Sequence, residues 1–193
     1  MDSLRMAHPG DASAIAAIYA PSVTDAATSF ELVPPSAEEV AARIAQILAH
    51  APWLVLTRRG EVAGFAYASR HRERAAYQWS VDTSVYVRAD LCRAGIGRRL
   101  YSSLVILLRI QGFYAAHAGI TLPNPGSVAL HEAMGFRPIG TEPSVGYKLG
   151  AWHDVGWWQL ALRERVAAPA PPLSLRDAEA RPGWAEALGE TDT

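Results

Sequence analysis

The chain has 193 residues, half of them apolar, with a formal net charge of −1 and one cysteine. This length predicts one domain with a substantial core, and the apolar fraction argues against disorder. The near-neutral charge does not favour binding to nucleic acid or to an anionic membrane, and one cysteine excludes a disulfide framework or a multi-cysteine metal site. No apolar segment reaches the about 18 residues of a membrane-spanning helix, and no secretory signal is recognisable, so we expect a soluble, cytoplasmic protein.

The first half of the chain predicts a short strand, two helices and a strand hairpin. Residues 4–6 form the predicted first strand, and Asp11 is a suitable N-cap for the first helix. Ser36-Ala-Glu-Glu39 has the form of a capping box and opens a second helix with its apolar residues on one face. Residues 53–57 and 62–68 are predicted strands joined by a polar turn.

The second half continues with strands that alternate with helices. Residues 77–87 predict a long strand, and the apolar spacing from Leu100 to Leu108 predicts a helix that ends near Gln111, with Gly112 following it. Residues 114–120 are the next predicted strand.

The remainder of the sequence predicts one more helix, two strands and a tail. Asn124 suits an N-cap position and Pro125 the first helical position. Strands are predicted over 136–141 and 152–162. The element order indicates an α+β fold: a central mixed, mostly antiparallel sheet with helices on both faces. We expect a domain over 1–165 and a Pro/Ala-rich, poorly packed and flexible C-terminal tail over 166–193.

The stretch between the long strand and the following helix has the features of an anion site. Val85-Tyr86-Val87 ends the strand, and Arg93-Ala94-Gly95-Ile96-Gly97-Arg98 opens the helix. Free backbone N–H groups and the positive end of the helix dipole converge at such a turn, and glycine lets the backbone approach a pyrophosphate closely. The turn is no P-loop, because no lysine follows either glycine, and no dinucleotide fingerprint, because Leu100 stands in place of the third glycine. A tight structural turn is the alternative.

This strand, a five-residue spacer and the Arg-x-Gly-x-Gly turn resemble motif A of the GNAT acetyltransferase superfamily, and the predicted element order over 4–162 is similar to that fold. Cys92 stands where the family usually has Gln or Arg. The resemblance implies a GNAT-type acyl-CoA N-acyltransferase fold with acetyl-CoA as co-substrate and no metal. It implies that the pantetheine arm lies along Val85, Tyr86 and Val87 and that Asn124 contacts the cofactor. The pyrophosphate would be held by Arg93, Ala94, Gly95, Ile96, Gly97 and Arg98.

Further stretches resemble the phosphinothricin N-acetyltransferase family, among them Pro52-Trp-Leu-Val55, Leu130-His-Glu-Ala-Met-Gly-Phe136 and Trp152-His-Asp-Val-Gly156. The resemblance implies transfer of acetyl to the α-amine of a small amino acid of the phosphinothricin, methionine sulfoximine or methionine sulfone type. It also implies a homodimer, with which the aromatic strand from Trp152 agrees. The segment 30–34 departs from the family pattern, which leaves the substrate preference open. A GNAT-fold sensor without turnover, or an acetyltransferase that acts on a peptide or protein amine, are the alternatives.

Two residues are candidates for proton transfer. An α-ammonium group must lose a proton before it can attack a thioester. Asp82 stands where the family has Glu and is the candidate base, acting directly or through a water; a structural carboxylate is the alternative. His131 takes the place of a tyrosine that many relatives use as the acid for the leaving thiolate, and a histidine that is only hydrogen-bonded on its helix is the alternative. We expect the oxyanion donor to be a backbone N–H near Val87.

The resemblance also implies residues that hold the amino-acid substrate. Arg72 and Arg74 could pair with a carboxylate or phosphinate, because a guanidinium group binds such anions through two parallel hydrogen bonds. Phe30, Tyr77 and Ser84 would line the pocket.

Overall fold

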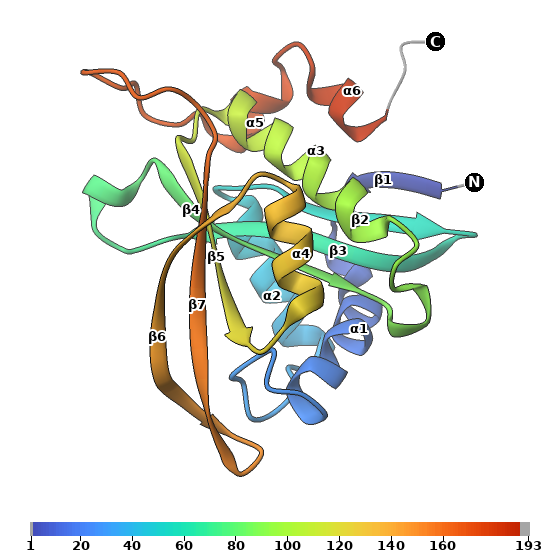
Figure 1. The fold of residues 1–193 in the computed structure, drawn as a ribbon. Coiled ribbons are helices and arrows are strands. Elements are labelled where there is room, and N and C mark those ends of the chain that lie inside the picture. Colours follow the sequence, from blue (N-terminus) through green and yellow to red (C-terminus); the bar gives the residue numbers. More distant parts are fainter. Residues whose placement is uncertain (1, 190–193) are drawn as a thin grey trace.

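The computed structural model describes residues 2–189 (Figure 1). In chain order the elements are β1 (Asp2–Met6), α1 (Ala12–Thr24), α2 (Ala37–Leu48), β2 (Trp53–Arg58), β3 (Glu61–Arg70), β4 (Ser80–Val87), α3 (Ile96–Gln111), β5 (Ala115–Leu122), α4 (Pro125–Ala133), β6 (Arg137–Lys148), β7 (Ala151–Ala161), α5 (Leu175–Glu179) and α6 (Trp184–Leu188). Short 3-10 turns lie at η1 (Pro9–Asp11), η2 (Ala75–Tyr77) and η3 (Ala89–Leu91). Within residues 2–189, no helix has the length and apolar character needed to cross a membrane.

The strands form one seven-stranded sheet in the order β1-β2-β3-β4-β5-β7-β6, which confirms the predicted mixed, mostly antiparallel sheet. Its parallel pair is β4 with β5, and that pairing is short: Ser80–Asp82 lie beside Ala115–His117. Beyond Asp82, β4 remains paired with β3, and β5 remains paired with β7. The two central strands therefore separate toward their C-terminal ends (Figure 1).

Apolar side chains on β2 and β3 point alternately to the two faces of the sheet, which explains why helices cover both faces. Trp53, Val55 and Phe65 point to one face and form a core with α1 and α2. Leu54 and Leu56 point to the other face, where they pack with α3. The sheet thus has no free face along these strands, as the predicted α+β architecture requires.

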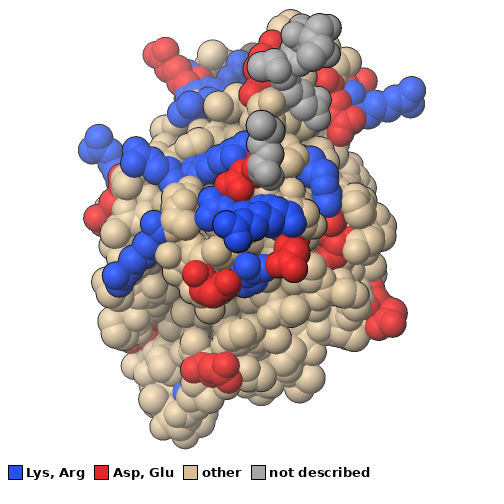
Figure 2. All heavy atoms as spheres, turned by 90° about the vertical axis from the view of Figure 1, so that its right-hand side faces the viewer, with Lys and Arg blue, Asp and Glu red and all other residues tan. Residues whose placement is uncertain are grey.

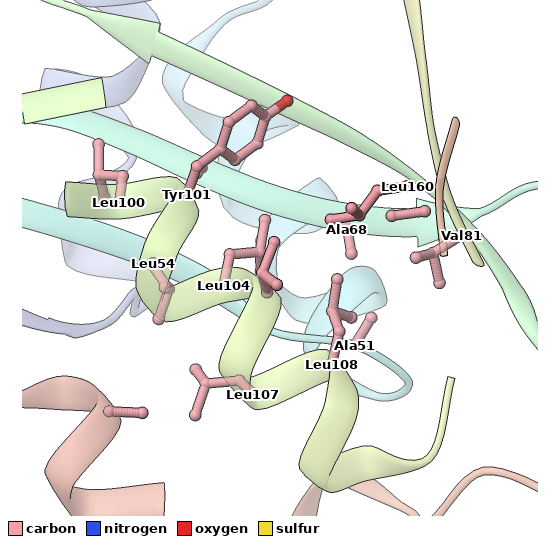
Figure 3. Close-up of a cluster of buried hydrophobic side chains, with 14 of the residues drawn as sticks. Ala51, Leu54, Ala68, Val81, Leu100, Tyr101, Leu104, Leu107, Leu108 and Leu160 are labelled. Carbon is pink, nitrogen blue, oxygen red and sulfur yellow. The ribbon is translucent and has the colours of Figure 1, made fainter. Parts of the chain in front are cut away.

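Helix α3 lies against the sheet through the apolar stripe that its spacing predicted. Its leucines from Leu100 to Leu108 are fully buried; Leu104 and Leu108 point toward the strands, and Leu107 points toward the C-terminal segment (Figure 3). A side chain on Gly64 of β3 would place its Cβ 3.1 Å from Ile96, so the bare glycine lets α3 begin close to the sheet. The helix ends as predicted, with Gly112 in the left-handed region at φ 98°.

Two features differ from the predictions, the N-cap at Asp11 and the end of β6. Helix α1 continues through Pro21, because an exposed proline removes one helical hydrogen bond without leaving a buried group unpaired. Asp11 precedes α1, but its carboxylate makes no cap and instead accepts two hydrogen bonds from Arg5, at 2.7 and 2.8 Å. Strand β6 is longer than predicted and reaches Lys148, because its pairing with β7 continues across two register shifts.

The segment after Val166 differs from the expected poorly packed tail. Its described part folds back over α3, where α5 and α6 cover the helix (Figure 1). Leu175, Trp184 and Leu188 are buried in the same core as α3, and the Gln111 side chain donates a hydrogen bond of 3.0 Å to the Leu173 carbonyl. These apolar residues give the segment a surface to bury despite its prolines. Residues 190–193 of the predicted tail lie outside the described part.

Candidate active site

A cavity of about 210 Å³ occupies the place where β4 and β5 separate. Residues 83–87 of β4 form one wall, 119–121 of β5 form another, and Ser22 and Thr28 close it on the α1 side. Since this edge of β4 has lost its pairing with β5, alternate residues direct unpaired backbone N–H and C=O groups into the gap. The cavity therefore offers a strand edge to an extended ligand.

The glycine turn lies next to this cavity. Gly95 is the N-cap of α3 with φ 80°, and the first turn of the helix carries no acidic residue. A Cβ on Gly97 would lie 3.3 Å from Leu130 and 3.6 Å from Val87, so the missing side chain keeps the backbone accessible between α3, α4 and β4. Arg93 and Arg98 are exposed beside it. The view in Figure 2, from the right-hand side of Figure 1, shows basic side chains concentrated in the upper half of that face and few charges below. This geometry fits a pyrophosphate on the N-terminus of α3.

The remaining predicted cofactor residues lie around the same space. Val85, Tyr86 and Val87 line the cavity from β4, and Asn124 lines it at the start of α4. The Asn124 side chain accepts a hydrogen bond of 3.1 Å from the Ser127 N–H, which confirms its predicted N-cap position. The strand edge thus lines the cavity, and the helix start adjoins it at Gly97, where a Cβ would lie 3.6 Å from Val87 and 3.9 Å from Val85.

His131 lines the cavity but is itself buried among hydrogen-bond partners. Its Nδ1 lies 2.7 Å from the Ser127 carbonyl oxygen, which can only accept, so Nδ1 carries the hydrogen. Nε2 of the neutral ring then accepts from the Tyr101 hydroxyl, at 2.8 Å. Burial lowers the pKa of His131, although the hydrogen bond to Ser127 opposes this. His131 and Tyr101 therefore form a coupled pair in which the tyrosine hydroxyl also lines the cavity.

Asp82 belongs to a polar cluster with two histidines. Its Oδ1 lies 2.7 Å from Nδ1 of His71, and the His71 ring stacks on the His117 ring with centroids 4.2 Å apart. Burial raises the pKa of Asp82, and the His71 hydrogen bond opposes that shift. Burial and the neighbouring His71 lower the pKa of His117. This cluster therefore holds a carboxylate and two imidazole rings, groups that can accept or donate a proton.

The arrangement of the cluster favours proton transfer over metal binding. One ligand atom each from His71, Asp82 and His117 can be chosen so that all three lie within 4.8 Å of one another. Imidazole lone pairs lie in the ring plane, however, and these two rings are stacked with an angle of 15° between their planes. Their lone pairs therefore run side by side and do not converge on one point.

Two of the predicted substrate residues lie beside the Asp82 cluster. The Tyr77 ring approaches His71 edge-on at 5.9 Å, and the Arg72 guanidinium lies 6.0 Å from the Trp157 ring. Nη1 of Arg72 also donates a hydrogen bond of 2.9 Å to the His71 carbonyl. A guanidinium group and two aromatic rings thus accompany the candidate base.

The other predicted substrate residues are more dispersed. Ser84 lines the cavity between the strands. Phe30 packs against Gly146, where any side chain would collide with its ring, and lies 6.4 Å from the His153 ring. Arg74 is exposed just before η2.

Sequence reasoning missed several residues that the fold brings to the site, namely His71, His117, Tyr101 and Trp157. Tyr101 falls between the buried leucines of α3, and a tyrosine in such a stripe signals a buried hydroxyl that needs a polar partner. His71 is adjacent to Arg72 and was visible as a titratable group in the same loop. Only the fold shows that His117 and Trp157 face them.

The sheet opens between its central strands, a glycine turn and helix start lie on one side of the opening, and a partly buried acid–histidine cluster lies near the other. This arrangement defines an acyltransferase that uses an acyl-CoA. The cavity fits an extended pantetheine arm, and the turn fits its pyrophosphate.

Comparisons with known proteins agree with this class. The acetyltransferase (GNAT) domain family matches residues 4–157. The chain is 38% identical to phosphinothricin N-acetyltransferase of Streptomyces viridochromogenes, over 90% of this chain and 92% of the relative. It is 32% identical to an L-methionine sulfoximine/L-methionine sulfone acetyltransferase of Salmonella typhimurium, over 87% of this chain and 99% of the relative.

A solved structure gives the same result. A GNAT superfamily phosphinothricin acetyltransferase from Sinorhizobium meliloti, crystallised in complex with acetyl-CoA, superimposes with a TM-score of 0.83 at 35% identity and covers 91% of this chain and 98% of its own. The chain belongs to the phosphinothricin N-acetyltransferase family within the GNAT superfamily. It is an acetyl-CoA-dependent N-acetyltransferase, as the resemblance of its motifs predicted.

Proposed function

We propose that this enzyme acetylates the α-amine of a small amino acid of the phosphinothricin, methionine sulfoximine or methionine sulfone type. Relatives with these names cover nearly the whole chain. The observation that carries the proposal is the pairing of the cavity between β4 and β5 with the Asp82 cluster, which offers a base, a guanidinium group and aromatic walls to a zwitterionic acceptor.

Acetyl-CoA, when bound, supplies an activated acetyl thioester. The N–H groups of the turn from Arg93 to Arg98 would hold its pyrophosphate, and the free edge of β4 would hold the pantetheine arm. A backbone N–H near Val87 would stabilise the oxyanion that forms when an amine adds to the carbonyl.

The proton transfers divide between two groups of residues. The Asp82 cluster would remove the proton from the acceptor ammonium, because it holds a carboxylate whose pKa is raised by burial and a paired imidazole, and either group can accept a proton. The coupled Tyr101 and His131 lie at the cavity wall, where the leaving thiolate needs a proton. His131 acts there through the tyrosine hydroxyl, because Tyr101 occupies its free nitrogen.

The acceptor would lie beside Arg72 and Tyr77, with Ser84, which lines the cavity, between it and the cofactor. Phe30, which packs on Gly146, would contribute a further apolar contact. Arg74 is exposed and close in sequence, and it would reach the carboxylate or phosphinate from solvent.

A substrate panel tests this function. Release of CoA is measured with phosphinothricin, methionine sulfoximine, methionine sulfone, methionine and a short peptide with a free N-terminus. We expect turnover with the first three and kcat/KM at least about tenfold lower for the peptide, a difference of about 1.4 kcal/mol in transition-state binding. Faster turnover of the peptide would favour a protein acetyltransferase. Tight acetyl-CoA binding without turnover of any amine would favour a sensor.

The exposed outer part of the β6–β7 hairpin supports a homodimer. Large apolar side chains there are more than half exposed: Ile139, Tyr147, Leu149 and Trp152. Strand β6 is also an edge of the sheet, and long exposed apolar edges are normally covered. Sedimentation should give twice the 20.8 kDa mass of one chain, and a monomer alone at micromolar concentration would refute the dimer. The enzyme would act in the cytoplasm, with neither nucleic acid nor a membrane as partner, in keeping with its net charge of −1.

A further inference from the structure

The contact between Asp82 and His71 fixes which nitrogen of His71 is free. An ionised carboxylate only accepts hydrogen bonds, so the 2.7 Å contact between Oδ1 and Nδ1 requires a hydrogen on Nδ1. The neutral imidazole then has its lone pair on Nε2, the far side of the ring from Asp82. Carboxylate–imidazole pairs in hydrolases use this relation to orient a histidine base.

The surroundings of His71 keep the ring in place. The side chain is 14% exposed, with the His117 ring stacked on one face and the ring centroids of Tyr77 and Trp157 at 5.9 and 6.4 Å from its own. The charged and titratable groups that face it are Asp82, Arg72 and His117. Burial and the neighbouring His71 lower the pKa of His117.

Asp82 is already engaged with His71. Its side chain is 29% exposed, but its Oδ1 is occupied by Nδ1 of His71, its carboxylate is one methylene shorter than the Glu that the family has at this position, and its strand pairs with both β3 and β5. His71 comes from the loop between β3 and β4, the loop that also carries Arg72 and Tyr77. A base on this loop lies among the residues that would hold the acceptor.

We propose that His71 is the base that deprotonates the acceptor ammonium, and that Asp82 is a positioning residue that orients it. This inference rests on the proposed acetyl transfer and assigns its proton acceptor. Nε2 of His71 takes a proton from the ammonium group, and the N–H electron pair stays on the amine nitrogen. That nitrogen attacks the thioester carbonyl, the C–S bond breaks, and the thiolate leaves with the bonding pair. The nitrogen gives up its second proton as the neutral amide forms, and the thiolate takes one proton through the Tyr101 hydroxyl to become the thiol. The imidazolium then releases its proton to water.

Three single variants separate this assignment from direct action by Asp82. His71→Gln removes the base but keeps a side chain that can donate to Asp82, and Asp82→Asn removes the orienting charge. His50→Gln, an exposed histidine that contacts Arg70, is the matched control. We expect His71→Gln to lower kcat about 10²–10⁴-fold with unchanged acetyl-CoA affinity and melting temperature, and His50→Gln to match the wild type. A double variant that combines His71→Gln and Asp82→Asn should have a kcat within a few fold of that of His71→Gln alone, because the two residues act as one unit.

The pH dependence of kcat gives a readout that a structural role would not move. In the wild type, kcat should rise with pH through an inflection in the imidazole range. In His71→Gln that inflection should disappear, with activity recovering only toward alkaline pH as the amine loses its own proton. If His71→Gln keeps kcat within about threefold and keeps the inflection, while Asp82→Asn abolishes both, the assignment is overturned and Asp82 is the direct base.

NMR of ¹⁵N-labelled histidine tests the same assignment without turnover. We expect His71 to be the Nδ1–H tautomer at alkaline pH, with a downfield Nδ1 proton that is lost in Asp82→Asn. An Nε2–H tautomer would overturn the proposal even if the enzyme is active. Failure of the wild type to acetylate any amine would instead contradict the proposed function, and the tautomer would still decide the orientation of His71.

Discussion

Replacing Gly97 by valine should block acetyl-CoA binding while the fold survives. The Cβ would lie 3.3 Å from Leu130, 3.6 Å from Val87 and 3.9 Å from Val85, so the two added methyl groups fill the space between α3, α4 and β4. The cofactor would lose one or two charge-assisted hydrogen bonds to the backbone, each about 1.5–3 kcal/mol. A loss of about 2–4 kcal/mol raises Kd about 30- to 1,000-fold.

Calorimetric titration with acetyl-CoA measures this loss, and thermal melting checks the fold. Gly140→Val is the matched control, because a Cβ on Gly140 meets no atom within 4 Å and the residue lies in a strand. The overpacking at Leu130 costs about 1–3 kcal/mol of stability, less than the typical free energy of unfolding. A folded Gly97→Val protein with wild-type affinity would refute the placement of the pyrophosphate at this turn.

Three further predictions concern stability and the acceptor. Burial opposes ionisation of Asp11, but hydrogen bonds from Arg5 and from the backbone N–H of His8 outweigh it and hold the pKa of Asp11 below 3.8. Ionised Asp11 therefore adds to the free energy of unfolding in full above about pH 4, and this stabilisation is lost as the pH falls through the lowered pKa. In urea titrations, the free energy of unfolding of Asp11→Asn should consequently fall less on acidification than that of the wild type. Trp184→Ala should cost up to about 3–5 kcal/mol or release α6 from α3, and unchanged stability with unchanged hydrogen exchange in α6 would contradict its packing role. Arg74→Ala should cost about 2–4 kcal/mol of acceptor binding, which raises the KM of the acceptor about 30- to 1,000-fold and leaves the KM of acetyl-CoA unchanged. Equal changes in both KM values would indicate a folding defect.

Local signals in the sequence predict the cofactor half of the site. The glycine turn needs only a strand, a helix start and two residues without side chains, and all of these are contiguous from Val85 to Arg98. The caps at Ser36 and Asn124 were likewise correct, since a cap is formed within one turn of its helix. The Pro/Ala-rich composition of the segment after Val166 predicted a poorly packed tail. The few apolar residues of this segment nevertheless pack on α3, and composition alone does not show such packing.

The sequence by itself therefore determined the element order, the family and the turn that opens α3, because these depend on residues close in the chain. The tertiary structure decided what surrounds the candidate proton-transfer groups. Tyr101 meets His131 only because α3 and α4 cover the same face of the sheet, and His71 meets His117 only because β4 and β5 start as parallel neighbours. Hydrogen-bond partners and burial set the charge of a titratable group, and both are supplied by residues that are distant in sequence.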